Sequence, residues 1–389
     1  AAHKLGFDPI ELRRKNLVSS QEMPYTNAFG ITYDSGDYIK SMDIALRLAD
    51  WDGFEARAAA VRERGLRLGR GFANYVESSI GAPRERVDMT ISPAGRVEVV
   101  VGTQPTGQGH ETSFAQVTAD LLGVDASVVD IVYGDTDIVA EGGGSHSGRS
   151  MRHASTAIYG AIEKLKVQGA ALAAEAWSVE PQAVAYDDGQ FTECGGSRRL
   201  DWFELAALAA EGAAEGASEL EKPGLRITHS HVMHTPVFPN GCAACEVEVD
   251  TETGFVRITK YVAVDDVGRV INPLIVDGQT HGSIATGVGQ ALWERCYIDP
   301  DSGQPLSGSF MDYGIPHADE LPSFTTAFNE VPSPTNPLGV KSGGEGPTTA
   351  ALAVVINAIV DALRDLGIED IPMPATPFQV WQAIRDARQ

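Results

Sequence analysis

The sequence predicts an α+β protein made of two related halves, each a β-hairpin followed by helices. Residues 87–101 and residues 245–264 both alternate in the manner of two strands, and each pair of strands is joined by a four-residue turn that ends in glycine. Each hairpin leads to a Gly-Gln-x-His tetrapeptide, at residues 107–110 and 278–281, which we expect to be a loop that opens a helix. This repeated plan predicts a cleft between the halves, where ligand sites commonly lie.

The other elements follow from local patterns. A helix broken at Gly6 and a longer helical stretch over residues 37–63 begin the chain. A strand is expected at residues 128–133, and an acidic run at residues 209–221 is expected to be a surface helix or an insertion. Further helices are predicted over residues 111–122, 150–174, 282–293 and 348–366.

Composition excludes several classes of protein. The chain has 389 residues, is 43% hydrophobic and carries a formal charge of −23, which argues for a globular protein and against nucleic acid or an anionic membrane as a partner. No transmembrane run or signal-like segment is evident. Because the chain opens at Ala1 inside an apparent helix, we expect a processed product or a piece of something longer.

Two groups of residues suggest metal or thiol chemistry. Cys242 and Cys245 have zinc or redox spacing, but no second pair of cysteines completes a site, which favours a structural role. The four scattered cysteines fit a reducing compartment. His229, His231 and His234 are expected to be alternating surface side chains rather than metal ligands.

The most informative stretch is Lys-Ser-Gly-Gly-Glu-Gly-Pro at residues 341–347, directly before an apolar helix. Its glycines let the backbone approach a ligand closely, and Pro347 suits a first helical turn. Glu345 would then lie at a helix N-terminus, where the dipole favours an anion. The sequence leaves two roles open for this carboxylate, a general base and an ordinary helix cap.

Four glycine-rich loops of this kind precede helices, at residues 107–110, 142–150, 278–281 and 341–347. Backbone N–H groups at helix starts suit an extended anionic ligand that contains a pyrophosphate. Neither a P-loop nor a dinucleotide-binding fingerprint is present to explain them.

Six motifs, taken together, carry a family resemblance. They occupy residues 102–116, 134–137, 143–152, 265–273, 278–282 and 341–347. As a set they resemble the molybdopterin-binding large subunit of the xanthine dehydrogenase, aldehyde oxidase and carbon monoxide dehydrogenase family. The resemblance covers essentially the whole chain but only the C-terminal half of that subunit, which implies a fragment or a subunit split into two chains.

The resemblance also implies a site. In this family the molybdenum is held by the pterin dithiolene with no protein ligand, and the glutamate that matches Glu345 is the general base. By the same match, the residues that contact the cofactor are Gln108, Gly109, His110, Gly148, Arg149, Ser150, Gln279, Lys341, Ser342, Gly343 and Gly344.

Further expectations follow from the resemblance. The cofactor is expected in its molybdopterin cytosine dinucleotide form, with FAD and [2Fe–2S] clusters on partner chains and no nucleic-acid or membrane partner. The expected reaction is the oxidative hydroxylation of an aldehyde, an N-heterocycle or a similar small substrate in the cytoplasm. Residues 1–70 would be the helical end of the preceding molybdopterin subdomain, 71–235 the first cofactor-binding half, and 236–389 the second, with the catalytic glutamate.

Two alternatives stay open at this point. One is a non-catalytic nucleotide-binding or assembly module of the same fold. The other is a thiol or zinc protein that uses Cys242 and Cys245.

Overall fold

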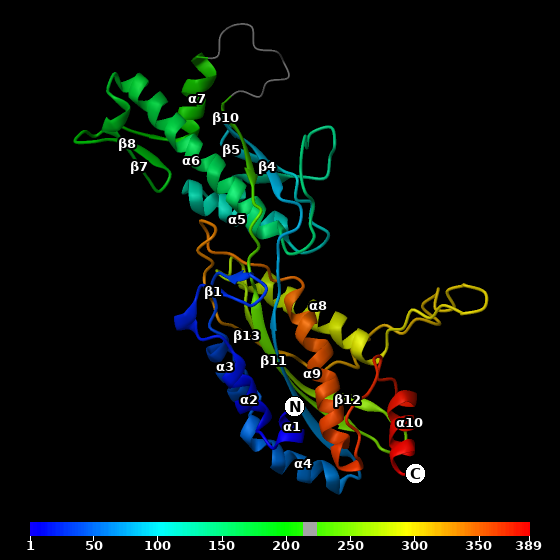
Figure 1. Ribbon diagram of the computed structural model, residues 1–389. Coiled ribbons are helices and arrows are strands. Elements are labelled where there is room, and N and C mark those ends of the chain that lie inside the picture. Colours follow the sequence, from blue (N-terminus) through cyan, green and yellow to red (C-terminus); the bar gives the residue numbers. More distant parts are fainter. Residues whose placement is uncertain (213–223) are drawn as a thin grey trace. The chain divides into compact units, whose positions relative to one another are not determined.

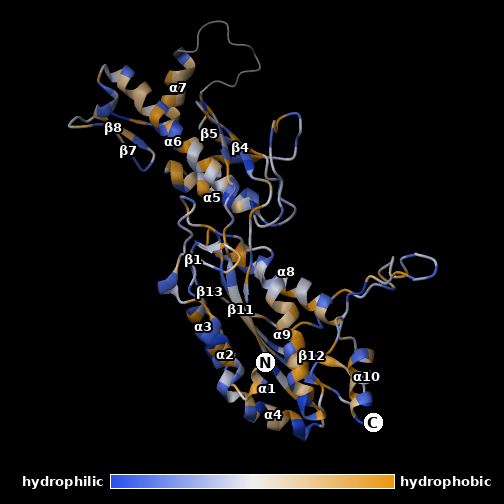
Figure 2. Cartoon of the chain, in the orientation of Figure 1, coloured by the Kyte–Doolittle hydropathy of each residue, from blue (hydrophilic) through white to orange (hydrophobic). Residues whose placement is uncertain are grey.

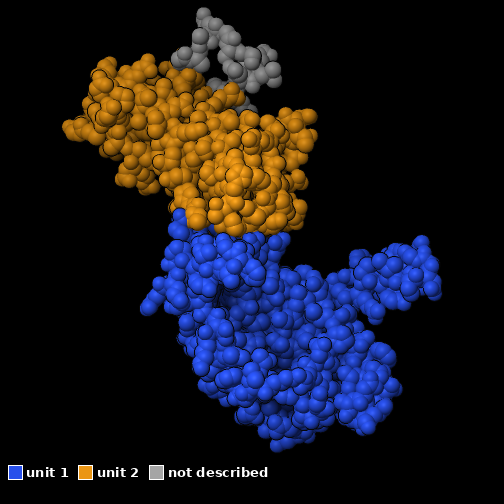
Figure 3. Space-filling model, in the orientation of Figure 1, with its two compact units in different colours: residues 1–78, 237–334, 341–389 blue, residues 79–236, 335–340 orange. Residues whose placement is uncertain are grey.

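The computed structural model describes residues 1–212 and 224–389 and confirms the α+β class (Figure 1). The described residues form two compact units, coloured separately in Figure 3. Unit 1 consists of residues 1–78, 237–334 and 341–389, and unit 2 of residues 79–236 and 335–340. Most of the acidic run predicted at residues 209–221 lies outside the described residues.

These units do not coincide with the three predicted stretches. Residues 1–70, predicted to belong to a preceding subdomain, pack within unit 1 beside most of residues 236–389. A short segment at residues 335–340 belongs to unit 2. As an assignment of domains, the three stretches stay a prediction.

Unit 2 is built on a four-stranded sheet in the order β10-β4-β5-β6. The predicted hairpin is β4 (Arg84–Ser92) and β5 (Arg96–Val101), and β10 (Leu225–Val232) pairs antiparallel with β4. Helix α5 (His110–Leu122) connects β5 to the parallel strand β6 (Val129–Val132). The long helix α6 (Ser150–Trp177) follows and packs on β4 and β10.

A small satellite completes unit 2. It consists of the 3₁₀ turn Pro181–Ala183, the antiparallel strands β7 (Val184–Asp187), β8 (Gln190–Glu193) and β9 (Arg199–Asp201), and helix α7 (Trp202–Gly212). Another 3₁₀ turn, Ala126–Val128, lies between α5 and β6. Trp202 is fully buried and packs edge-on against Phe191, which joins this satellite together.

Unit 1 has a second four-stranded sheet in the order β13-β12-β11-β3. The predicted hairpin is β11 (Asn240–Val249) and β12 (Val256–Asp266), and β3 (Arg67–Val76) pairs antiparallel with β11. Helix α8 (Pro273–Leu292) connects β12 to the parallel strand β13 (Thr325–Phe328). Helix α9 (Gly346–Leu363) follows, and α10 (Pro377–Ala387) ends the chain.

The two sheets share one topology, which confirms the predicted repeat. Each has a hairpin, a helix, a parallel third strand and a second helix, and each adds a fourth strand antiparallel to the first hairpin strand. In unit 2 the added strand β10 comes after this series, whereas in unit 1 the added strand β3 comes before it. The two units are therefore circular permutations of one arrangement.

The N-terminal helices cover one face of the sheet in unit 1. They are α2 (Pro9–Asn16), α3 (Tyr38–Leu48) and α4 (Phe54–Glu63), and the short helix α1 (Ala2–Leu5) precedes them without burying a residue. The same part of the chain has 3₁₀ turns at Ser20–Glu22 and Trp51–Gly53 and the short strands β1 (Tyr25–Thr26) and β2 (Thr32–Tyr33). The helix predicted over residues 37–63 is interrupted because Asp50 adopts a left-handed conformation with φ of 49°. Met42 and Ala45 of α3 pack on this face beside Cys242.

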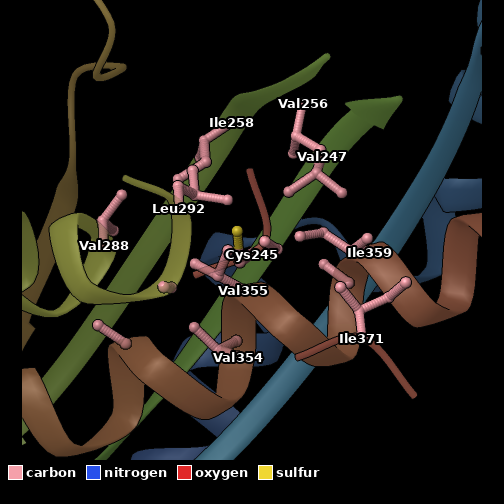
Figure 4. Close-up of a cluster of buried hydrophobic side chains, with 14 of the residues drawn as sticks. Cys245, Val247, Val256, Ile258, Val288, Leu292, Val354, Val355, Ile359 and Ile371 are labelled. Atoms are coloured by element: carbon pink, nitrogen blue, oxygen red, sulfur yellow. The ribbon is translucent and has the colours of Figure 1, made fainter. Parts of the chain in front are cut away.

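The opposite face packs against α8 and α9 and forms the largest core of unit 1 (Figure 4). Helix α9 is hydrophobic along most of its length (Figure 2). By length and composition alone it could cross a membrane, yet Val354, Val355 and Ile359 are fully buried against the sheet. Its apolar character is therefore accounted for by packing within unit 1.

Helix α9 lies unusually close to β3 because two residues of that strand have no side chain. A Cβ atom at Gly69 would lie 2.1 Å from the Ala358 carbonyl oxygen, and one at Gly71 would lie 2.0 Å from the Val354 carbonyl oxygen. These distances are shorter than any real contact, so a larger residue would push the helix away from the sheet.

We expect Gly71→Ala to lower the free energy of unfolding by about 1–3 kcal/mol, the range typical of overpacking, because the obstacle is helix backbone. Gly282→Ala is the matched control, since Gly282 lies on the exposed side of α8 with no atom within 4 Å of the added methyl. The control should be unchanged or stabilised by up to about 1 kcal/mol. Thermal unfolding of the purified variants measures both, and equal stability of the two would contradict the close packing.

Candidate functional site

Glu345 lies immediately before α9, as the sequence predicted. Its side chain is exposed, and in the described part of the chain it makes no capping hydrogen bond to the start of the helix. Its carbonyl oxygen accepts a hydrogen bond from the Thr348 N–H at 3.2 Å. The carboxylate is thus held at a helix N-terminus without the contact that a cap would make.

The loop before Glu345 is anchored to α8. The Ser283 hydroxyl donates to the Gly344 carbonyl oxygen, and the Thr348 hydroxyl donates to the Ser283 carbonyl oxygen at 2.9 Å. Gly344 itself is exposed, and Gly343 is half-buried beside Val267. The loop therefore presents its backbone on a support formed by α8.

Gln279 faces this loop, but from inside a helix. The prediction of a loop at residues 278–281 is wrong, because α8 begins at Pro273. The Asn272 side chain caps it by accepting from the Ile275 N–H at 3.1 Å, and proline suits the first turn. The Gln279 Oε1 atom lies 3.8 Å from the position that a Cβ of Gly344 would occupy. The structure thus brings Gln279 and the Glu345 loop together.

The Lys341 side chain makes its contacts inside the protein, unlike a lysine that binds a ligand. Its ammonium group is fully buried, pairs with the Asp266 carboxylate at 2.7 Å and donates to the Ser35 carbonyl oxygen at 3.2 Å. Burial raises the pKa of Asp266, and the Lys341 charge opposes that shift. The side chain of Lys341 therefore ties the loop to the end of β12.

A buried hydrogen-bonded group lies under the site, and sequence reasoning did not single it out. The Asp265 carboxylate accepts from the Tyr75 hydroxyl at 2.8 Å and from the Thr280 hydroxyl at 3.0 Å. Burial raises the pKa of Asp265 to about 6, against the lowering effect of these two hydrogen bonds. The sequence signals were the pair of adjacent acids at the end of a strand and the motif at residues 265–273, which begins with Asp265.

In unit 2, Gln108, Gly109 and His110 form the start of α5. Gly109 precedes the helix in a left-handed conformation with φ of 73°, and the Gln108 side-chain oxygen accepts from the Thr106 hydroxyl at 3.2 Å. His110 is buried and stacks on Phe114 with ring centroids 4.8 Å apart. Burial lowers the pKa of His110 to about 4, so the imidazole is neutral at pH 7.

Arg149 is neither a surface cation nor a free donor. It is fully buried and pairs with the buried Glu85 carboxylate at 2.8 Å. Its five N–H groups make five hydrogen bonds, to the carbonyl oxygens of Ala82, Arg84 and Gly144, the Thr103 hydroxyl and the Glu85 carboxylate. A planar guanidinium has five donors, so none remains for a ligand.

These contacts make Arg149 a clamp on the loop at residues 142–150. A Cβ on Gly143 would lie 2.5 Å from the Arg149 Cζ atom, so the loop can pass over the guanidinium only as glycine. The Ser145 hydroxyl donates to the Gln104 carbonyl oxygen at 2.7 Å. The loops at residues 102–110 and 142–150 therefore lie side by side, and Gly148 and Ser150 flank the clamp at the start of α6.

The thiol and metal alternatives lose their geometric basis. Cys242 and Cys245 are three residues apart on β11 and therefore point to opposite faces of the sheet, one into the α3 core and the other into the α8–α9 core. Burial raises the pKa of both thiols. No group of three potential metal ligands occurs among the residues that the structure describes.

The histidines of β10 also differ from the prediction. His229 and His231 share one face of the strand because they are two residues apart, and they are half-buried rather than on the surface because α6 packs on β10. A Cβ on Gly160 of α6 would lie 2.3 Å from the His229 Nε2 atom, so His229 packs directly on that helix. His234 is exposed.

Comparisons with known proteins define the family. The molybdopterin cofactor-binding domain matches residues 44–322. The carbon monoxide dehydrogenase large chain of Hydrogenophaga pseudoflava is 30% identical over 99% of this chain and 49% of its own length. A crystal structure of Cu,Mo-CO dehydrogenase superimposes with a TM-score of 0.90 at 29% identity, over 100% of this chain and 50% of the other. Quinoline 2-oxidoreductase from Pseudomonas putida 86 gives 0.89 at 32% identity, over 99% and 50%.

The chain therefore belongs to the molybdopterin cofactor-binding family of molybdenum-dependent dehydrogenases, which includes the carbon monoxide dehydrogenase large chains and the molybdenum-binding subunits of xanthine dehydrogenase. This confirms the resemblance that the sequence motifs carried. The chain spans about half the length of the curated relatives that it matches.

The described loops fit such a cofactor. In unit 1 the Ser342 hydroxyl is buried without a hydrogen-bond partner among the described residues, and in unit 2 the same holds for the His110 Nε2 atom, so each unit by itself has a polar atom that a ligand can satisfy. The Gly344 backbone is exposed beside the Gln279 amide. Hydroxyl, amide and backbone groups are what an anionic pterin requires, and a metal held by the pterin itself needs no cluster of protein ligands.

We expect Arg149→Met to lower the free energy of unfolding by about 3–5 kcal/mol, because it leaves the Glu85 charge buried and unpaired. Arg96→Met is the control, since Arg96 pairs with Asp130 where the two side chains are 47% and 51% exposed. Loss of that surface pair should change stability by no more than about 1 kcal/mol. Thermal unfolding distinguishes the two. An Arg149 variant that unfolds like wild type but has lost its cofactor would show that the guanidinium binds the cofactor instead.

Proposed function

We propose that this chain is the part of a molybdenum hydroxylase that binds the molybdenum–pterin cofactor and carries the general base, Glu345. Family membership supports the cofactor. The observation that carries the catalytic assignment is the exposed Glu345 carboxylate, which stands at the start of α9 without a capping hydrogen bond in the described chain, with Gln279 across the loop.

We further propose which residues hold the cofactor. In unit 1, Gln279 would donate and accept through its amide, and residues 342–344 would contribute the buried Ser342 hydroxyl and glycine backbone. In unit 2, Gln108, Gly109 and His110 would contribute side-chain and backbone groups at the start of α5. Arg149 and Lys341 would act by shaping their loops, since their charges are paired inside the protein. Gly148 and Ser150 would contribute backbone and hydroxyl groups.

When bound, the molybdenum–pterin group supplies the oxygen that is added to the substrate and takes up the electron pair of the broken C–H bond. The role of Glu345 is to accept the proton of the attacking hydroxyl at a carboxylate oxygen, so that the oxygen becomes a stronger nucleophile. Gly343 and Gly344 place no side chain on the two residues before the carboxylate. The Ser283 hydrogen bond to the Gly344 carbonyl oxygen holds the backbone from which the carboxylate projects.

The substrate is proposed to be an aldehyde, an N-heterocycle or a similar small molecule. A relative is named nicotine 6-hydroxylase large subunit and another quinoline 2-oxidoreductase, both of which act on N-heterocycles by name. An aldehyde oxidoreductase subunit is more distant, at 25% identity. We also propose the cytosine dinucleotide form of the cofactor and a cytoplasmic location, the latter because the few cysteines are scattered and free.

Partner chains with FAD and [2Fe–2S] clusters are proposed as the route by which electrons leave, together with the remaining half of the large subunit. The chain spans only about half of its relatives' length. Large apolar side chains are exposed on unit 1, with Phe310 at 86% and Met311 at 92%, and such residues suit contact with another protein surface.

One alternative to this proposal is a non-catalytic cofactor-binding or assembly module of the same fold. It differs from our proposal only in whether Glu345 does chemistry. The thiol or zinc alternative is disfavoured, because Cys242 and Cys245 lie on opposite faces of β11.

We expect Gln279→Ala and Gln108→Ala to weaken cofactor retention, because each removes a side-chain hydrogen bond worth roughly 1.5–3 kcal/mol if its partner is charged. Gln290→Ala is the control, since Gln290 is exposed on the same helix as Gln279. Molybdenum and pterin content per chain of the assembled enzyme measures the effect. Full occupancy in both Gln279→Ala and Gln108→Ala would remove these residues from the cofactor site.

We expect Glu345→Gln to keep the fold and the cofactor but to slow substrate-driven reduction by ~10²–10⁴-fold, because the amide cannot accept the proton. Glu180→Gln is the matched control, since Glu180 is also exposed and precedes a helical turn without a capping hydrogen bond. Anaerobic stopped-flow reduction of cofactor-replete enzyme measures the rate.

Reoxidation of chemically reduced Glu345→Gln should be normal, because electron exit does not use the base. If Glu345 were only a helix cap, the variant would instead reduce at a near-normal rate and lose about 1 kcal/mol of stability. That result would favour the non-catalytic module.

A further inference from the structure

Three neighbouring strands of unit 1 place Tyr75 and Asp265 on the same row of the sheet. Tyr75 of β3 lies opposite Gly241 of β11, which in turn lies opposite Asp265 of β12. A Cβ on Gly241 would lie 2.8 Å from both the Tyr75 Cε1 atom and the Asp265 Oδ1 atom. The glycine therefore lets the tyrosine ring cross the middle strand, and the Tyr75 hydroxyl donates a hydrogen bond to the Asp265 carboxylate at 2.8 Å.

Both helices of the candidate site rest on this pair. In α8, the Thr280 hydroxyl donates to the second oxygen of Asp265 at 3.0 Å. In α9, a Cβ on Gly346 would lie 2.7 Å from the Tyr75 hydroxyl oxygen, so the first turn of the helix packs directly on that hydroxyl. Tyr75, Asp265 and Thr280 are 6%, 1% and 1% exposed, so water does not compete for these contacts.

The residues on these two helices that meet the network are the direct neighbours of the proposed functional residues. Thr280 follows Gln279, and Gly346 follows Glu345. We propose that Tyr75, Asp265 and Thr280 form a positioning network that sets the placement of Glu345 relative to Gln279. This inference rests on the proposed function of Glu345 for its effect on rate, but its structural part can be measured without any turnover.

The ion pair beside Asp265 explains why its carboxylate depends on two hydroxyl donors. Asp266 and Lys341 form their own buried pair beside Asp265, so Lys341 is not available to compensate the Asp265 carboxylate. Two hydroxyl donors from β3 and α8 take that role instead. Removal of either donor leaves a buried carboxylate oxygen with fewer partners, and the element that carried the donor, β3 or α8, loses a contact that fixed it.

The test is Tyr75→Phe in the assembled enzyme, which removes one oxygen atom and keeps the ring. Tyr261→Phe is the matched control, since Tyr261 is also buried in unit 1 and its hydroxyl has no hydrogen-bond partner among the described residues. Tyr186→Phe controls for the loss of a hydrogen bond as such, because its hydroxyl bonds to the Leu122 carbonyl oxygen in unit 2.

Hydrogen–deuterium exchange of peptides that cover residues 276–283 and 342–349 is the first readout. In Tyr75→Phe we expect exchange there to be faster by about 2- to 10-fold, which corresponds to the loss of one buried hydrogen bond. The second readout is the split between kcat and KM. We expect kcat to fall by roughly 10- to 100-fold, the scale of a misplaced catalytic group, while KM changes less.

A second pair of variants keeps the test decisive if Tyr75→Phe folds poorly. Thr280→Val removes the hydroxyl and keeps the shape, whereas Thr280→Ser keeps the hydroxyl. Faster exchange in Thr280→Val, with wild-type behaviour in Thr280→Ser, supports the network. Unchanged exchange at residues 342–349 in both Tyr75→Phe and Thr280→Val overturns it. Faster exchange with an unchanged kcat supports the positioning network and counts instead against Glu345 as the base.

Discussion

The close approach of α9 to β3 is the constraint on which the rest of unit 1 depends. Gly69 and Gly71 let helix carbonyl oxygens lie where side chains would otherwise stand, so the distance between helix and sheet has almost no freedom. Along the same face of the strand, Tyr75 meets the first turn of the helix. The glycines set the distance of the helix from the sheet, and the tyrosine packs against its first turn. Glu345, at the start of the helix, therefore has one defined position.

Each unit ties a glycine-rich loop to its sheet with a buried ion pair. Lys341 and Asp266 do this in unit 1, and Arg149 and Glu85 do it in unit 2. A buried pair contributes little net stability, because desolvation offsets most of the attraction, but the loss of either partner is severe. Such pairs therefore select one arrangement of a loop over others. This suits loops that must keep their backbone groups directed at a ligand while carrying few side chains of their own.

The shared topology of the two sheets gives this pattern a simple structural origin. In both units the loops proposed to bind the cofactor lie at or near the start of a helix that packs on the sheet. Gln279 of unit 1 differs, because it lies inside helix α8. The circular permutation leaves β3 of unit 1 before the whole of unit 2 in the chain. As a result, Tyr75 is 190 residues from its partner Asp265.

The sequence by itself determined the α+β class, both hairpins, most helices and the position of Glu345, because alternation, helical periodicity and turn residues are local signals. The motif set also determined the family. The helical position of Gln279 was readable from Asn272-Pro273, a cap followed by a first-turn proline, which the Gly-Gln-x-His similarity outweighed. Only the tertiary structure decided that Arg149 is fully hydrogen-bonded inside the protein, that Cys242 and Cys245 face different cores, and that Tyr75 packs on Gly346, the residue after Glu345. Those roles depend on partners from distant strands, and the burial that makes them matter exists only once the sheet has formed.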